Sequence, residues 1–116
     1  LEKDIEDAFN LMQEIQFPKP KIHVFVCTND RTERPHNTTP SCGPRITGEH
    51  VKQLKQWIRE QGLTTIVYCT KTQCLGFCNA ESSVVCIYPS GKFYKGIQTI
   101  EEMKELILKE MDALEI

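Results

Sequence analysis

Apolar residues recur along the chain at two different spacings, and these spacings predict helices and strands in alternation. Near the N-terminus they return every three or four residues, as in an amphipathic helix, until Pro18 and Pro20 end the pattern. The same spacing returns twice later in the chain. We therefore expect a helix over about residues 2–16, a second from an N-cap at Thr47 to just before Gly62, and a third that opens with a capping box of Thr99 and Glu102.

Four short runs rich in β-branched and aromatic residues predict strands. The first two runs are apolar almost throughout, as in buried strands, and the last two flank a PSGK turn, as in a hairpin. The predicted strands are Lys21–Val26, Leu63–Tyr68, Ser83–Tyr88 and Phe93–Ile97. The order is therefore a helix, then strand–helix–strand, then strand–strand–helix. Because a crossover of this length joins parallel strands, the pattern predicts an α/β fold.

Length and composition restrict the classes of function. With 116 residues, of which 40% are hydrophobic and 26% charged, the chain fits one globular domain. No apolar run is long enough for a membrane span, and the acidic N-terminus is unlike a signal peptide, so we expect a cytoplasmic protein that binds no membrane. The sequence contains no Gly-rich phosphate loop. It also lacks the combination of aromatic and basic residues that forms a nucleic-acid-binding surface, so we expect no nucleic-acid partner. Acidic residues predominate at both ends and basic residues between them, which indicates either solvated helix faces or a basic middle that balances a bound anion.

Four of the six cysteines lie at or after the ends of the two predicted parallel strands. Cys27 ends the first strand and Cys42 lies in its loop, while Cys74 and Cys78 lie in the loop after the second strand. Because ligands gather at the carboxyl ends of parallel strands, these thiols are expected to meet at one edge of the sheet. Four thiolates hold either a zinc ion or an iron–sulfur cluster. A structural zinc usually takes two close pairs, whereas only one pair is close here, so the spacing favours a binuclear cluster and leaves zinc open.

Four motifs together resemble those of the thioredoxin-like [2Fe-2S] ferredoxins. They are HVFVCTNDR (residues 23–31), CG (42–43), TQCLGFC (72–78) and VVCIYPSGKFYKGI (84–97). The resemblance extends from about Lys21 to Glu110. The wide gap between the first two cysteines is more similar to the freestanding ferredoxins than to the related domain of a respiratory complex I subunit. The resemblance implies a thioredoxin-like domain with a mixed four-stranded sheet over residues 18–116, preceded by an extra amphipathic helix over residues 1–17.

The same resemblance implies a cofactor and a function. The protein would be a one-electron carrier between redox partner proteins, without catalytic activity of its own, although it could be a domain or subunit of a larger oxidoreductase. Related ferredoxins also suggest a homodimer, for which Phe93 and Tyr94 would be exposed apolar residues on the hairpin. The chain departs from the family at NAESS (79–83), where a Gly-Pro pair is usual. The residues implied as ligands of one [2Fe-2S] cluster per chain are Cys27, Cys42, Cys74 and Cys78.

Two other hypotheses use the same thiols. One is a thioredoxin-fold thiol–disulfide oxidoreductase acting through Cys74 and Cys78, with or without Cys69, and the other is a zinc-binding interaction module. Redox enzymes of that fold normally place Cys-x-x-Cys at a helix N-terminus, whereas here three residues separate the pair. Cys69, expected at the end of the second strand, is then a bystander, a substitute ligand or a redox thiol. Cys86 lies within a predicted strand and is expected to be buried as a small apolar residue.

Several other residues in or near the predicted loops have both a functional and a structural interpretation. Gly76 either lets backbone N–H groups approach anionic sulfur or only permits a tight turn. Phe77 shields the cluster, marks the docking face for a partner, or only packs within its loop. The basic side chains either offset the cluster's charge and attract an acidic partner or only keep the loops soluble. These basic residues are Arg31, Arg34, Arg45 and Lys71, and the three histidines, which we expect not to be ligands, are His23, His36 and His50.

Overall fold

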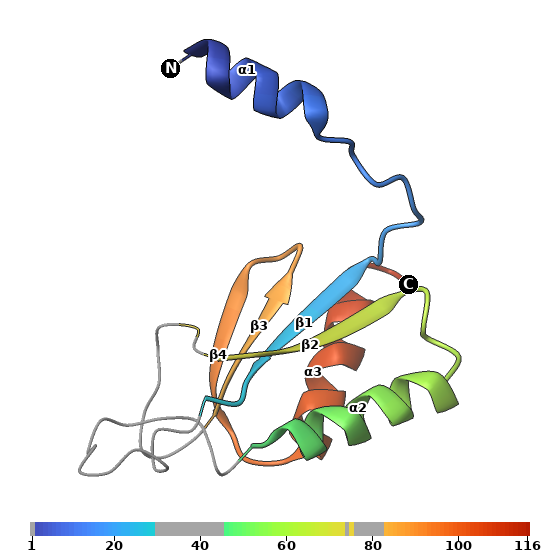
Figure 1. Cartoon of the computed structure of the whole chain (residues 1–116). Helices are drawn as coiled ribbons and strands as arrows, with labels where there is room; N and C mark the ends of the chain where they lie inside the picture. The colour runs from blue at the N-terminus through green and yellow to red at the C-terminus, as the bar shows by residue number, and fades with distance from the viewer. Residues whose placement is uncertain (1, 30–45, 74, 76–82) are drawn as a thin grey trace, which may run out of the picture.

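The computed structural model of the chain describes residues 2–29, 46–73, 75 and 83–116. Three helices and four strands within these residues follow in the predicted order, which confirms the α/β fold (Figure 1). In chain order they are α1 (Glu2–Leu11), β1 (Ile22–Cys27), α2 (Gly48–Glu60), β2 (Val67–Thr72), β3 (Ser83–Tyr88), β4 (Lys92–Ile97) and α3 (Ile100–Ala113). None of the described helices is long and apolar enough to cross a membrane.

The four strands form one mixed sheet in the order β2-β1-β3-β4. β1 and β2 run parallel, and β3 is antiparallel both to β1 and to β4. The predicted mixed sheet and its parallel pair are therefore confirmed. In the parallel register Cys27 lies opposite Thr72, so the carboxyl ends of β1 and β2 lie side by side. β2 and β4 are the edge strands.

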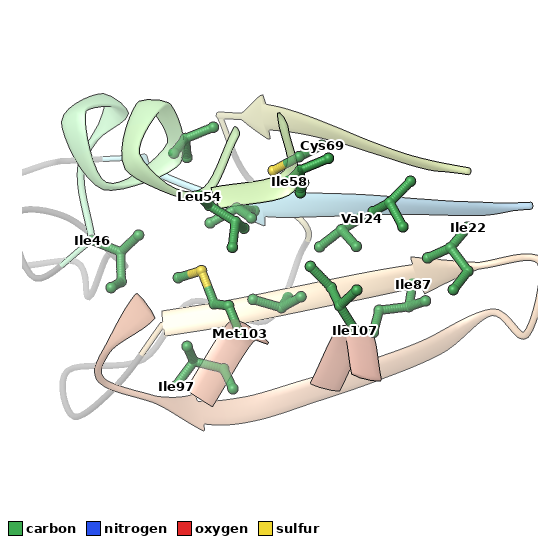
Figure 2. Close-up of a cluster of buried hydrophobic side chains, with 14 residues drawn as sticks. Ile22, Val24, Ile46, Leu54, Ile58, Cys69, Ile87, Ile97, Met103 and Ile107 are labelled. Atoms are coloured by element: carbon green, nitrogen blue, oxygen red, sulfur yellow. The ribbon is translucent and has the colours of Figure 1, made fainter. Parts of the chain in front are cut away.

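Both C-terminal helices cover the same face of the sheet. α2 contacts β2, α3 contacts β1, and the two helices contact each other (Figure 1). The hydrophobic core lies between this helical layer and the sheet, and Figure 2 shows its side chains pointing toward one another from both layers. Fully buried members include Ile22, Val24 and Ile87 from the sheet and Leu54, Met103 and Ile107 from the two helices.

The opposite face of the sheet carries aromatic side chains, because neighbouring residues of a strand point to opposite faces. The ring of His23 stacks on Phe25 with a centroid distance of 4.1 Å and meets the edge of Tyr68 at 5.9 Å. Phe25 in turn meets the edge of Tyr88 at 6.0 Å. These contacts join β1 to the strand on each side of it.

The predicted N-caps of both C-terminal helices are confirmed. The hydroxyl of Thr99 accepts a hydrogen bond from Glu102 N at 3.3 Å, while the Glu102 carboxylate accepts one from Gln98 N at 3.0 Å. At the start of α2, Thr47 N donates to Nδ1 of His50 at 3.0 Å, so a histidine does here what Glu or Gln does in an ordinary capping box.

The second strand was predicted four residues too early, at Leu63–Tyr68 instead of Val67–Thr72. Leu63 O accepts hydrogen bonds from Ile66 N at 3.0 Å and from Val67 N at 2.9 Å, so these residues form a turn. Buried and exposed residues alternate over the first four residues of β2, so the expectation of a strand buried throughout is wrong. An edge strand with one covered face accepts the polar residues of the sequence VYCTKT.

Two further expectations differ from the structure. α1 ends at Leu11 rather than near residue 16, and none of its described side chains is buried. A helix with no packing surface has little to hold its last turn. On the hairpin, Phe93 is exposed as expected, but Tyr94 is partly buried against the core and is not a surface residue.

Candidate metal centre

Cys27 ends β1 and is fully buried. Its Sγ donates a hydrogen bond to the carbonyl oxygen of Gln73 at 3.2 Å, just beyond the end of β2. The backbone pairing also continues past the strands, because Thr28 N donates to Thr72 O at 2.9 Å. The segment after β1 and the segment after β2 are therefore held together at the sheet edge where the thiols are expected.

Two apolar side chains pack against Cys27. Val84 of β3 is 1% exposed and forms a small cluster with Cys27, and Leu75 packs against this pair. The cluster is separate from the main core between the sheet and the helices. An apolar shell of this kind controls the access of water and the local dielectric around a metal site.

The other three predicted ligands, Cys42, Cys74 and Cys78, lie outside the described residues, as do Gly76, Phe77, Arg31, Arg34, Arg45 and most of the NAESS segment. Among the residues that the structure does describe, no group of three or more His, Cys, Asp or Glu is placed so that it could hold a metal ion. Lys71 is described and exposed in β2, opposite Val26 of β1. Gln73 and Leu75, which precede and follow Cys74 in the sequence, both lie at the Cys27 site.

Cys69 does not lie where the sequence suggested. It is the third residue of β2, opposite Val24 rather than at the strand end, and its side chain is 7% exposed in the main core. Burial raises the pKa of its thiol from 9.0 to about 11, although the charge of Lys55 acts in the opposite direction. At neutral pH Cys69 is therefore a protonated thiol, which is neither a ready ligand nor a nucleophile.

Cys86 is buried in β3, as expected, and is 1% exposed. Burial raises the pKa of its thiol, and a hydrogen bond with Tyr88 acts in the opposite direction. Like Cys69, it forms no disulfide. Its position within a buried strand is that of a small apolar residue.

The two described histidines make structural contacts. Nε2 of His23 lies 2.7 Å from the hydroxyl of Thr70, and desolvation by burial lowers the pKa of its imidazole, so the ring is neutral at physiological pH. His50 caps α2 through Nδ1. His36 lies outside the described residues. Of the described groups at this edge of the sheet, the thiol of Cys27 is the one whose chemistry suits iron or zinc, since soft thiolates bind both.

The chain was compared with known proteins. No family model matches it. It is 26% identical over 97 residues to "Ferredoxin, 2Fe-2S" of Clostridium pasteurianum, a match that covers 84% of this chain and 91% of the relative. Among solved structures, the wild-type thioredoxin-like [2Fe-2S] ferredoxin of Aquifex aeolicus superposes with a TM-score of 0.65 and 29% identity, over 80% of this chain and 87% of that one. A second structure of the Aquifex aeolicus ferredoxin gives a TM-score of 0.65 and 28% identity, over 81% and 83% of the two chains.

These likenesses agree with the topology described above. The chain has a thioredoxin-like fold, with a mixed sheet in the order β2-β1-β3-β4 and a buried thiol at the end of the parallel pair. The resemblance found in the sequence motifs is confirmed: the chain is similar in sequence and in fold to the thioredoxin-like [2Fe-2S] ferredoxins.

Proposed function

We propose that this protein is a [2Fe-2S] ferredoxin that carries one electron at a time between redox partner proteins. One cluster per chain would be held by Cys27, Cys42, Cys74 and Cys78. The observation that carries the proposal is the position of Cys27, a buried thiol at the carboxyl end of β1 that donates to Gln73, next to Cys74 in the sequence. The likeness to 2Fe-2S ferredoxins over most of the chain supports the same assignment.

When bound, the cluster supplies a site for one electron, and the chain's own residues set its surroundings. β1 is paired on both sides, so the backbone that carries Cys27 is held in a fixed position. Val84 and Leu75 exclude water from the thiol on their side. Thr28 N donates to Thr72 O, so this N–H group stabilises the strand pairing rather than a cluster sulfur.

The described cysteines argue against a thiol–disulfide enzyme. Such an enzyme needs a thiol whose pKa is lowered, commonly at a helix N-terminus. Burial instead raises the pKa of Cys69 and of Cys86, and Cys27 ends a strand rather than opening a helix, so none of these three thiols suits that chemistry, while Cys74 and Cys78 lie outside the described residues. We therefore propose that the chain has no independent catalytic activity, whether it acts alone or within a larger oxidoreductase. A zinc module with the same four ligands is separated from the ferredoxin by the experiment below.

The proposal also covers the organisation and the setting of the protein. We propose that residues 18–116 form the cluster-binding domain, that residues 1–17 are an appendage to it, and that the protein works in the cytoplasm with protein partners rather than membranes or nucleic acids. A homodimer is the remaining partner hypothesis, and the exposed ring of Phe93 on the hairpin supports it. Sedimentation of the purified protein over a range of concentrations tests the dimer.

Iron and sulfide analysis combined with visible spectra tests the function. The wild type, purified without oxygen, should contain about two irons and two sulfides per chain and show a visible spectrum that bleaches with dithionite. Cys27→Ser and Cys74→Ser should shift or abolish that spectrum, whereas the matched controls Cys69→Ser and Cys86→Ser should keep it. Circular dichroism identifies any variant that has lost its fold. A colourless wild type that binds zinc, or equal damage from all four substitutions in folded protein, would contradict the proposal.

A further inference from the structure

The N-terminal helix carries an apolar stripe that the rest of the described chain does not cover. α1 has ten residues, and Figure 1 shows it held away from the sheet and its two helices. Ile5 is 63% exposed, and Met12, directly after the helix, is 65% exposed. Because an isolated helix shorter than about 12–15 residues is only marginally stable in water, a helix of this length needs a surface to pack against.

A groove of suitable chemistry lies between α2 and the edge strand β2. Its volume is about 290 Å³, and its apolar lining residues are Ile58, Val67 and Cys69. Lys55 and Arg59 of α2 also line the groove, and both side chains are exposed. The groove therefore combines an apolar lining with two positive charges on one side.

The charges of α1 are complementary to those of the groove. Four exposed acidic residues accompany its apolar stripe, and within the described part of the chain neither Lys55 nor Arg59 has an ion-pair partner. A helix laid in the groove would place apolar side chains over the lining and carboxylates beside the two cations. These acidic residues are Glu2, Asp4, Glu6 and Asp7.

The connection between α1 and the sheet reaches the groove. Lys21 N and Ile22 N both donate to Ile66 O, at 2.9 and 3.0 Å, and the groove residue Val67 follows directly. The chain therefore enters β1 beside one end of the groove. Residues 12–20 have no regular structure and span at most about 30 Å when extended, enough for α1, about 15 Å long, to turn back.

We propose that α1 folds back onto the groove between α2 and β2 of its own chain. A tether of this length gives α1 a high effective concentration at the groove, which favours the chain's own helix over a separate molecule. The docked helix covers the open edge of β2, a protection that natural sheets commonly use, and shields Cys69. This inference is independent of the cluster and of electron transfer.

Hydrogen exchange measured by mass spectrometry on the full-length, cluster-loaded protein tests the docking. In the wild type the α1 amides should exchange at least about tenfold more slowly than in an unstructured peptide. Lys55→Glu with Arg59→Glu should remove this protection, and so should Ile5→Ser, which lies outside the folded domain. The matched control Lys92→Glu with Lys109→Glu reverses the same number of exposed charges elsewhere and should leave it unchanged. Unchanged protection of β1 and α3 shows that each variant remains folded.

Three results would overturn the inference. The α1 amides could exchange as fast as an unstructured peptide in the wild type, which means that the helix does not dock. Their protection could survive both Lys55→Glu with Arg59→Glu and Ile5→Ser, which means that it has another cause. Protection that is present at about 200 μM and absent at about 2 μM would show that a second copy, not the same chain, is the occupant.

Discussion

The thiol of Cys69 should react very slowly with alkylating reagents at neutral pH. This low reactivity distinguishes a buried bystander cysteine from a redox-active one. Its pKa is raised from 9.0 to about 11, because burial in the core disfavours the thiolate. At pH 8 a thiol with a pKa of 9.0 is about 9% ionised, whereas one with a pKa of about 11 is about 0.1% ionised. Alkylation of Cys69 in the folded protein should therefore be at least about 100-fold slower than in the unfolded chain.

The assay is a timed reaction with iodoacetamide at pH 8, followed by mass spectrometry of the peptide that contains Cys69, with the urea-unfolded protein as the reference. The rate should keep rising up to about pH 11. Lys55→Gln should slow the reaction further, because the cation stabilises the thiolate. Between about pH 9 and 11 only the unfolded chain releases the Cys69 proton. The free energy of unfolding should therefore fall by about 2–3 kcal/mol over this range as the pH rises. Labelling of folded protein within about tenfold of the unfolded rate would refute this reasoning.

Three further predictions concern the caps, the core and the aromatic face. Thr99→Ala removes the hydrogen bond from Glu102 N and should lower the free energy of unfolding, measured in urea, by about 1 kcal/mol. The control Thr99→Ser keeps the hydroxyl and should stay near the wild type, and equal effects of the two substitutions would contradict the capping role. Met103→Ala, at a fully buried position, should cost about 2–5 kcal/mol, against less than about 0.5 kcal/mol for Leu108→Ala at an exposed one. In an NMR titration His23 should ionise below pH 6.5, so that its contribution to stability falls as the pH drops below that value; a midpoint at or above 6.5 would show that the ring is not desolvated.

The strands differ in how well the sequence predicted them, and burial explains the difference. β1 and β3 are central and mostly buried, so their apolar runs mark them to within a residue. β2 is an edge strand that alternates buried and exposed residues, and the apolar run before it belongs to a turn. The sequence LTTIV therefore indicated a strand in the wrong place. Only the pairing of Val67 with Ile22 fixes where β2 begins.

At the site, the sequence predicted which thiol ends β1 but not what surrounds it. The position of Cys27 follows from the apolar run before it and from the parallel crossover. The wall made by Val84 and Leu75 joins β3 to the segment after β2, two parts of the chain whose proximity no local pattern encodes. The error over Cys69 follows directly from the misplaced strand. The basic groove was missed because Lys55 and Arg59 look like the solvated face of an ordinary helix until β2 is placed beside them.

The most direct test of the account is electron paramagnetic resonance of the anaerobically purified, dithionite-reduced protein, with spins, iron and sulfide quantified per chain. A [2Fe-2S] cluster predicts a silent oxidised state and a reduced signal of about one spin for about two irons. Cys27→Ser should remove or alter that signal, while Cys86→Ser should leave it unchanged. A folded protein that gives no signal after reduction and contains zinc or no metal would contradict the assignment of this chain as an electron carrier.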